Sequence, residues 1–176
     1  MFHVTERLLL RPFWPDDWKQ VHEGALDKGV ACNLARVPWP YREEDARWWV
    51  NQPQNCRLPS FAIVHSGSGR LIGSAGLDEH ENDIEIGYWL RRDAWGRGYA
   101  TEAARGVIDV ARMLGHRRLV AGHFIDNPAS GKVLRKIGFV PTGRNRPRFS
   151  LARGTEVESV EHAFDLKQPA SISRAA

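Results

Sequence analysis

The sequence predicts a single mixed α/β domain of the α+β kind, and three observations support this. Short apolar runs joined by polar turns occupy the first half of the chain, which favours antiparallel strands. Apolar residues then recur every three or four positions between Tyr99 and Leu114, as in an amphipathic helix, before another strand-like run. No internal repeat or low-complexity linker divides the 176 residues, so we expect one domain over residues 1–168 and a loose tail at 169–176.

The amino-terminal part of the chain alternates strand and helix signals. A short strand is expected at Leu8–Leu10, where three leucines follow one another. Helices are expected over Pro15–Leu26 and Arg42–Asn51, because proline and acidic residues suit the first turn of a helix. The prolines at Pro38–Pro40 predict a loop between the two helices.

Three strands are expected in the middle of the chain, at Ser60–His65, Arg70–Leu77 and Ile84–Leu90. Ser66-Gly67-Ser68-Gly69 joins the first two and is typical of a hairpin turn. The polar stretch Asp78–Asp83 joins the second and third strands. The pattern therefore predicts consecutive antiparallel hairpins.

The last third of the chain predicts a strand–helix–strand crossover. Glu102 lies in the first turn of the expected helix at 99–114, where the helix dipole favours an anion, and Gly115 follows as its C-cap. The elements expected after it are a strand at Leu119–Phe124, a short helix at Ser130–Ile137, and final strands at Phe139–Gly143 and Val157–Leu166.

Composition disfavours several classes of protein. The 25 basic and 21 acidic residues give a formal charge of +4, which fits an anionic small ligand and falls short of the basic stripe expected for nucleic acid. The two cysteines suit no disulfide framework, and the seven histidines lack zinc-ligand spacing, so no metal is expected. No apolar run reaches the roughly 18 residues of a membrane span, and Arg7 and Arg11 interrupt the apolar start, so we expect a cytoplasmic protein with no membrane partner.

The segment from Trp89 to Ala103 predicts a phosphate-binding loop. A strand leads into Gly96, Gly98 and Ala100, and a helix starts immediately after them. Small residues let the backbone approach a ligand, and the unpaired N–H groups of the first helical turn attract phosphate. Mobile positive charge is expected from Arg91, Arg92 and Arg97.

Two common phosphate sites do not fit this segment. A P-loop requires G-x-x-x-x-G-K-[ST], which the chain lacks. A dinucleotide fold places its loop after the first strand and an acidic residue roughly 20 positions later, where this chain has Val120. A nicotinamide- or flavin-dependent oxidoreductase is therefore disfavoured, although it stays open at this point.

A second segment, His123–Phe139, follows the next expected strand. Together with Gly96–Ala103 it resembles the GNAT superfamily of acetyl-CoA-dependent N-acetyltransferases. Gly96–Ala103 resembles the pyrophosphate loop of that superfamily. The resemblance of the second segment to the other cofactor segment rests on Asn127, Ser130, Val133-Leu134 and Gly138-Phe139.

The opening segment Thr5–Pro12 and the strand Ile86–Leu90 resemble the RimJ/RimL-type branch of the superfamily. The likeness extends over about residues 5–166, nearly the whole chain. It implies a GNAT-like fold, with a central, mostly antiparallel, twisted sheet flanked by helices. That sheet splays open between two neighbouring parallel strands, which correspond here to Ile84–Leu90 and Leu119–Phe124.

The resemblance implies acetyl-CoA as co-substrate. Pantetheine would pair with free backbone groups at Leu90–Arg92, and the pyrophosphate would lie on the amides of Arg97–Thr101. The implied cofactor residues are Leu90, Arg91, Arg92, Arg97, Gly98, Tyr99, Ala100, Thr101, Asn127, Ser130 and Lys132. Of the other basic residues that follow, those from Arg144 to Arg153 are expected to form a solvated face.

The implied reaction is direct transfer in a ternary complex, without a protein nucleophile. A backbone N–H near Leu90 would stabilise the developing oxyanion. Leu134 stands where many members have a tyrosine that protonates the departing thiolate, so Ser130, which matches a serine of the RimL-like branch, is the expected substitute. Serine also suits a helix N-cap, and both roles can hold at once. The later glutamate of that branch has no counterpart, because the chain reads Arg148-Phe149-Ser150.

The amine must lose its proton before it attacks, so a base is expected. Glu85 resembles a position that the superfamily often fills with glutamate. His123 lies near the end of the next expected strand, and the ordinary pKa of histidine suits base work at neutral pH. Asp78 and a base relayed through water are further alternatives. The catalytic candidates are therefore Glu85, His123 and Ser130.

The segment Asn33–Tyr41 is expected to line the acceptor pocket, because its prolines and aromatic residues would form a rigid wall. Trp48 and Trp49 fit either that wall or the core. The expected acceptor-binding residues are Asn33, Arg36, Trp39 and Tyr41.

The leading hypothesis is an enzyme that acetylates a primary amine, either a protein N-terminus or a small molecule. A large acidic cleft would favour a polycationic acceptor, and a narrow pocket a small amine. The alternative is a catalytically weak CoA-binding sensor or interaction module, because the tyrosine and the glutamate are missing. Both a monomer and a homodimer remain open.

Overall fold

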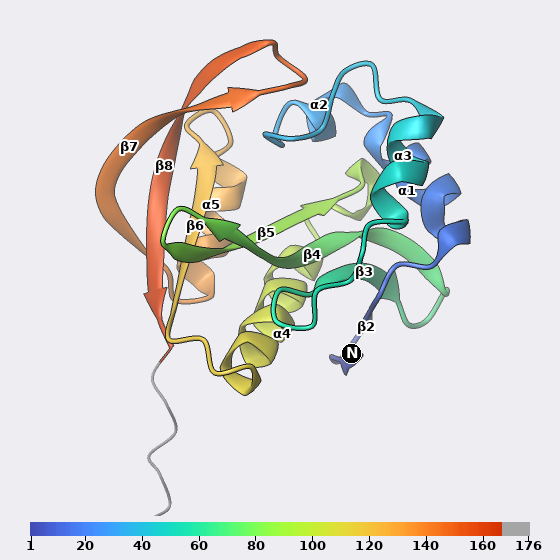
Figure 1. The fold of residues 1–176 in the computed structure, drawn as a ribbon, viewed down its shortest axis with the longest axis horizontal. Coiled ribbons are helices and arrows are strands. Elements are labelled where there is room, and N and C mark those ends of the chain that lie inside the picture. Colours follow the sequence, from blue (N-terminus) through green and yellow to red (C-terminus); the bar gives the residue numbers. More distant parts are fainter. Residues whose placement is uncertain (167–176) are drawn as a thin grey trace, which may run out of the picture.

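The computed structural model describes residues 1–166, which form an eight-stranded sheet with helices on both faces (Figure 1). The strands are β1 (His3–Val4), β2 (Leu8–Arg11), β3 (Ser60–His65), β4 (Arg70–His80), β5 (Asp83–Leu90), β6 (Arg118–Phe124), β7 (Val140–Ser150) and β8 (Thr155–Asp165). The helices are α1 (Trp18–Ala25), α2 (Lys28–Ala31), α3 (Glu43–Val50), α4 (Tyr99–Met113) and α5 (Pro128–Lys136). The expected tail at 169–176 lies outside the described residues.

The strands lie in the order β1-β2-β3-β4-β5-β6-β8-β7. Within residues 1–166 the neighbouring strands pair antiparallel, except for the parallel neighbours β5 and β6. The expectation of a mixed, mostly antiparallel sheet flanked by helices is therefore confirmed.

Two elements are longer than the sequence indicates. The stretch Asp78–Asp83 is mostly strand, because β4 continues to His80 and only a tight turn separates it from β5. The strand expected at Phe139–Gly143 is β7, which extends to Ser150. β7 was underestimated because it is a largely exposed edge strand with few apolar residues, and prolines are tolerated on such an edge.

Three helical segments differ from the expectation, two of them at their first residues. The first begins as a single turn of 3-10 helix at Pro15–Asp17 before α1. Helix α2 was not expected, and it is capped by the Asp27 carboxylate, which accepts hydrogen bonds from the N–H groups of Gly29 and Val30. Helix α5 begins at Pro128 rather than Ser130, with Asn127 as its N-cap.

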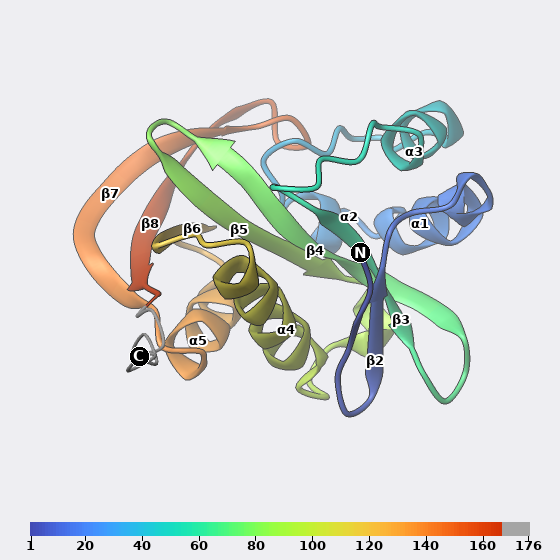
Figure 2. The same ribbon diagram turned by 60° about the horizontal axis from the view of Figure 1, so that its bottom comes forward.

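Two apolar clusters hold the helices against the sheet. α4 and α5 cover one face, where their buried residues pack with those of β2 to β6. α1 and α3 cover the opposite face through a smaller cluster that includes Phe13, Val21 and Ala46. Figure 2 shows the two groups of helices on opposite sides of the sheet. None of the helices found in residues 1–166 combines the length and apolar composition needed to cross a bilayer.

The sheet opens between β5 and β6. These two strands share a single registered residue pair, Glu85 with Val120, whereas β4 and β5 stay paired from His80–Asp83 to Gly73–Leu90. On its other side, β6 pairs with β8 along its whole length. The expected splay between parallel strands is therefore present, and it widens from Glu85 towards Leu90.

A buried ion pair attaches the start of α1 to β2. The Arg11 guanidinium donates to both Asp17 oxygens at 2.7 Å, and the two side chains are 7% and 6% exposed. The same carboxylate accepts a hydrogen bond from the Trp14 N–H. Because the charges are desolvated, each needs the other as its partner.

Asp17→Ala should lower the free energy of unfolding by about 3–5 kcal/mol, because it leaves the Arg11 charge buried without its partner. Urea unfolding followed by circular dichroism measures the loss. The control is Asp109→Ala, which removes an exposed ion pair with Arg112 and should change stability by less than about 1 kcal/mol. Equal losses in the two variants would contradict this role for the buried pair.

Candidate active site

A cavity of about 1160 Å³ passes through the sheet at the opening between β5 and β6. Every residue from Glu85 to Leu90 lines it. Because successive side chains of a strand point to opposite faces, a cavity that contacts all of them lies on both faces of the sheet. It therefore connects the face covered by α4 and α5 with the face covered by α1 and α3.

Unpaired backbone groups of β5 face this opening. The Arg91 N–H donates to the Ile72 carbonyl at 2.9 Å, so Arg91 bonds to β4. Backbone groups alternate in direction along a strand, and those of Tyr88 and Leu90 therefore turn towards β6. The Leu90 carbonyl accepts a hydrogen bond of 2.8 Å from the Trp95 indole. The expectation of free groups across Leu90–Arg92 is thus wrong for the Leu90 carbonyl and the Arg91 N–H. The groups that face the opening are the Leu90 N–H and those of Tyr88.

The expected phosphate loop lies at one end of the cavity, at the start of α4. Gly98 is the N-cap of α4 with a φ of +82°, a conformation that side-chain-bearing residues adopt only with strain. The first N–H groups of α4 have no intrahelical acceptor, and the helix dipole adds positive potential there. The loop residues that line the cavity are Gly96, Gly98, Tyr99, Ala100 and Thr101.

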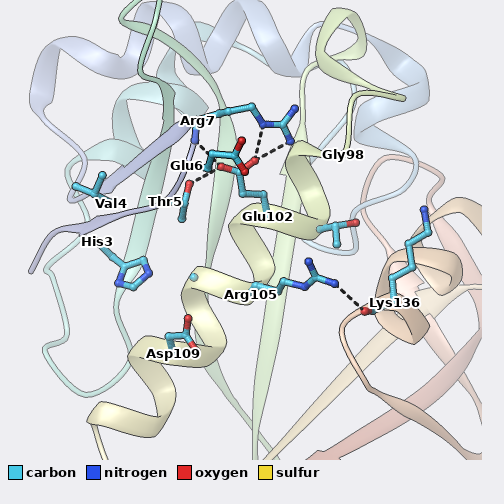
Figure 3. Close-up of a pocket in the computed structure, with 12 residues that line it drawn as sticks. His3, Val4, Thr5, Glu6, Arg7, Gly98, Glu102, Arg105, Asp109 and Lys136 are labelled. Carbon is cyan, nitrogen blue, oxygen red and sulfur yellow. Dashed lines mark hydrogen bonds and ion pairs between the residues drawn. The ribbon is translucent and has the colours of Figure 1, made fainter.

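A clamp of polar side chains, not anticipated from the sequence, fixes this loop from behind (Figure 3). The Glu102 carboxylate accepts hydrogen bonds from the Thr5 hydroxyl at 2.6 Å and from the Arg7 backbone N–H at 2.7 Å. It also accepts one from Arg7 Nε at 2.7 Å. Burial alone would raise the pKa of Glu102, but these bonds hold it below its usual value.

Arg7 extends the clamp onto the loop itself. Its Nη1 donates to the Arg97 carbonyl at 3.1 Å, and its guanidinium lies 4.6 Å from the centre of the Tyr99 ring. A second cavity, of about 670 Å³, is lined by Arg7 and Glu102 of the clamp and by Gly98 of the loop. The clamp therefore ties the loop to the segment that precedes β2. The clamp joins two stretches that stand out in the sequence, Thr5–Pro12 and Gly96–Ala103. No local sequence pattern indicates that these two stretches contact each other.

Two of the arginines near the loop contact other side chains of the protein. Arg91 Nε donates to the Asp93 carboxylate at 2.9 Å. The Arg92 guanidinium lies 4.7 Å from the Trp95 ring centre and 3.9 Å from an Asp27 oxygen. The expectation of mobile charge is therefore wrong for the largely buried Arg91, whereas the Arg92 side chain is 61% exposed. The Arg97 side chain is exposed and is not among the residues that line the cavity. Lys132 is exposed and lines the cavity.

Helix α5 forms the wall opposite β5. Asn127 Oδ1 accepts a hydrogen bond of 3.3 Å from the Ser130 N–H, so Asn127 rather than Ser130 caps the helix. The Ser130 hydroxyl is 3.0 Å from the Tyr88 hydroxyl across the opening. Leu134 is fully buried. Asn127 and Ser130 both line the cavity, as expected.

Glu85 and Arg148 form a bidentate ion pair on the other face. The two guanidinium nitrogens lie 2.5 and 2.7 Å from the two carboxylate oxygens. Hydrogen bonding to Glu85 raises the pKa of Arg148 despite its burial. Arg153 also pairs, with Asp126, and donates to the Cys32 carbonyl. The expectation of a solvated face over Arg144–Arg153 is therefore wrong for Arg148 and Arg153.

His123 lines the cavity on β6. Its Nδ1 lies 2.9 Å from the Phe124 carbonyl oxygen. A carbonyl only accepts, so Nδ1 carries a hydrogen, and in the neutral ring Nε2 is then the acceptor nitrogen. The His123 ring packs 5.2 Å from the ring of His162, whose pKa is lowered by burial.

The expected acceptor segment forms the far wall of the cavity. Asn33 and Tyr41 line it, and Arg36 lines it in an ion pair with Asp78, whereas Trp39 is not among the lining residues. Trp48 and Trp49 also line it. Asn33 Nδ2 donates a hydrogen bond of 2.8 Å to the Gly29 carbonyl oxygen. Burial raises the pKa of Tyr41 to about 12.

The tip of the β7–β8 hairpin covers this segment (Figure 1). The Leu151 N–H donates to the Ala35 carbonyl at 2.9 Å, and Leu151 itself lines the cavity. The acceptor side thus lies between two chain segments that are hydrogen-bonded to each other. No group of three or more His, Cys, Asp or Glu side chains within residues 1–166 is arranged to hold a metal ion.

Comparisons with known proteins agree with this geometry. The family described as Acetyltransferase (GNAT) domain matches residues 7–140. YnaD, an uncharacterized N-acetyltransferase of Bacillus subtilis (strain 168), is 30% identical over 142 residues, which cover 78% of this chain and 82% of YnaD.

Solved structures share the fold. The GNAT-family acetyltransferase from Bacillus anthracis has a TM-score of 0.82 at 26% identity, over 94% of this chain and 98% of that one. RimL, a ribosomal L7/L12 alpha-N-protein acetyltransferase in complex with coenzyme A, has a TM-score of 0.77 at 20% identity, over 94% and 98% of the two chains. Because the family match spans more than half of its residues, this chain belongs to the GNAT acetyltransferase family.

Proposed function

We propose that this protein transfers an acetyl group from acetyl-CoA to a primary amine, by direct attack of the neutral amine in a ternary complex. The observation that supports this most is the single cavity that runs from the phosphate loop, past the unpaired backbone groups of β5, to the acceptor wall. Two substrates that enter from opposite faces would meet at the opening, already oriented for reaction.

The residues at the cofactor end fit acetyl-CoA. The first-turn amides of α4 suit a pyrophosphate, and the Leu90 N–H, the unpaired group of β5 nearest the loop in sequence, suits an amide-containing pantetheine arm. Lys132, at the edge of the cavity, suits a further phosphate. The shared fold with RimL, which is described with coenzyme A, supports the same ligand here.

The chain supplies three functions around the reacting atoms. The unpaired Tyr88 N–H, two residues before Leu90 on β5, is placed to stabilise the oxyanion that develops on the thioester. Ser130 is placed to donate a hydrogen bond to the departing sulfur. His123 is the proposed proton acceptor, because its Nε2 keeps a lone pair while Nδ1 is fixed by the Phe124 carbonyl. Glu85 is assigned to orienting Arg148, since both of its oxygens are held in the ion pair.

The acceptor proposed is an amine with an apolar or small body, either a free small molecule or a protein N-terminus. Trp48, Trp49 and Tyr41 place three aromatic side chains on this wall. Two of its carboxylates, Asp78 and Glu85, are neutralised by arginines. The third lining carboxylate, Asp45, forms no ion pair within residues 1–166 and could attract one ammonium group. A polyamine or aminoglycoside would find only this one unpaired negative charge for its several cations, so such an acceptor is disfavoured.

Calorimetric titration with acetyl-CoA, followed by an amine screen for released thiol, tests the proposal. We expect 1:1 binding of acetyl-CoA, no binding of NAD, and turnover with primary amines. Binding without turnover across the screen would favour the CoA-binding sensor, for which the apolar Leu134 is the supporting observation. Absence of acetyl-CoA binding would contradict both functions.

Gly98→Ala should weaken acetyl-CoA binding at least about tenfold, because a Cβ strains the loop where the amides must converge. The matched control is Gly115→Ala, at the other end of α4, where φ is +80° and nothing lies within 4 Å of the new Cβ. Both variants should lose similar stability in thermal unfolding. Equal losses of affinity would show that strain alone, rather than the loop, explains the effect.

Arg7→Ala should raise the KM for acetyl-CoA about tenfold and change kcat little, because Arg7 holds the loop without lining the β5–β6 cavity. Steady-state kinetics with varied acetyl-CoA provides the measurement. Arg112→Ala is the control, since that arginine lies near the end of α4, away from the loop, and has the same 41% side-chain exposure. An unchanged KM in Arg7→Ala would refute the clamp.

A further inference from the structure

We propose that Tyr88 is a positioning residue that aims the Ser130 hydroxyl at the sulfur of coenzyme A. This inference rests on the proposed function, because it assigns a role within the same site. Ser130 has a rotating hydroxyl that both donates and accepts, so on its own it has no fixed donor direction. A second hydroxyl beside it determines which way its hydrogen points.

The contact joins the two walls of the opening. Tyr88 lies on β5 and Ser130 in the first turn of α5, and the two residues are 42 positions apart in the sequence. The Tyr88 hydroxyl is 3.0 Å from Ser130 Oγ and 3.3 Å from the Ser130 carbonyl oxygen. Both residues line the cavity. The bond therefore lies where β5 and β6 have separated, between the two elements that flank the opening.

Packing holds the Tyr88 ring in place. The ring lies against the apolar cluster between the sheet and α4, which includes Ile86 and Leu134. A phenol on a ring fixed in this way keeps its oxygen in one place. Helix α5 carries no tyrosine one turn after Ser130. That position is Leu134, which is apolar and fully buried. The aromatic hydroxyl comes instead from the opposite wall.

Tyr88 has one hydrogen to donate and two acceptors within reach, Ser130 Oγ at 3.0 Å and the Ser130 carbonyl oxygen at 3.3 Å. We assign this hydrogen to the nearer Oγ, because a phenol is a stronger acid than an aliphatic alcohol and is the better donor of the two hydroxyls. When Tyr88 donates to Ser130 Oγ, the Ser130 hydrogen is free to point into the cavity. Burial raises the pKa of Tyr88 to about 12, so the phenol stays protonated throughout the neutral range and the arrangement persists.

The acetyl transfer then needs no reactant other than acetyl-CoA and the amine. The amine nitrogen forms a bond to the acetyl carbon, and the carbon–sulfur bond breaks with its electron pair going to sulfur. Ser130 donates a hydrogen bond to that sulfur, and Tyr88 donates to Ser130, so the negative charge is shared along two bonds. The proton lost by the amine passes to the base, and the thiolate takes a proton from solvent after release.

The test is a titration of the thiol of coenzyme A bound to the protein, followed by the ultraviolet absorbance of the thiolate. It needs no acceptor amine. In the wild-type protein, the pKa of the bound thiol should lie below that of free coenzyme A. Tyr88→Phe should raise it by about one unit, a tenfold loss of thiolate at a given pH. Ser130→Ala should raise it at least as much.

The double variant Tyr88→Phe/Ser130→Ala should match Ser130→Ala alone, because Tyr88 acts only through Ser130. The control for this titration is Tyr41→Phe. Tyr41 is also a cavity-lining tyrosine whose pKa burial raises to about 12, and its removal should leave the thiol pKa unchanged.

Kinetics separates positioning from simple loss of structure. Tyr88→Phe should lower kcat about tenfold with little change in the KM for acetyl-CoA. The defect should shrink when an acetyl thioester with a more acidic thiol replaces acetyl-CoA, since a better leaving group needs less help. A bound thiol that titrates alike in wild type and Tyr88→Phe would overturn the role of Tyr88 alone. Failure of the wild-type protein to bind coenzyme A would overturn the proposed function, and this inference with it.

Discussion

The parting of β5 from β6 after a single residue pair is the constraint on which the candidate site depends. A strand in the middle of a sheet normally satisfies its backbone groups on both sides, and unpaired groups are costly where water is excluded. Here β5 is fully paired with β4 and free on its other edge beyond Glu85. The protein therefore maintains a row of unsatisfied donors and acceptors, and an extended ligand with amide groups would complete the sheet.

The elements around this opening hold it in a fixed shape. On one side, the Glu102 clamp joins the phosphate loop to the chain before β2, so the loop cannot move independently of the sheet. On the other side, the hairpin of β7 and β8 bonds to the segment near Ala35 and carries Arg148 to Glu85. Polar contacts between distant segments thus keep both ends of the cavity organised, a condition for charge stabilisation without reorganisation.

The sequence predicted what depends on local pattern. The helical period of α4, the glycines at 96 and 98 and the hairpin turn at 66–69 all act over a few residues, and the family resemblance rests on such segments. It did not predict the length of β7, whose charged residues pair with distant segments, as Arg146 does with Glu81 in the β4–β5 turn. Nor did it predict the hydrogen bond between Tyr88 and Ser130 or the ion pair between Arg148 and Glu85, because those partners are 42 and 63 positions apart. Such contacts follow from strand register, which one sequence does not reveal.

Amide hydrogen exchange at Tyr88 and Leu90, measured with and without coenzyme A, tests the central claim most directly. The account predicts slower exchange on binding at these two β5 amides and at the first-turn amides of α4, with no change at the β3 amides, which pair on both sides in the free protein. Protection at the α4 amides alone, with Tyr88 and Leu90 exchanging as before, would contradict the claim that the ligand enters the opening between β5 and β6.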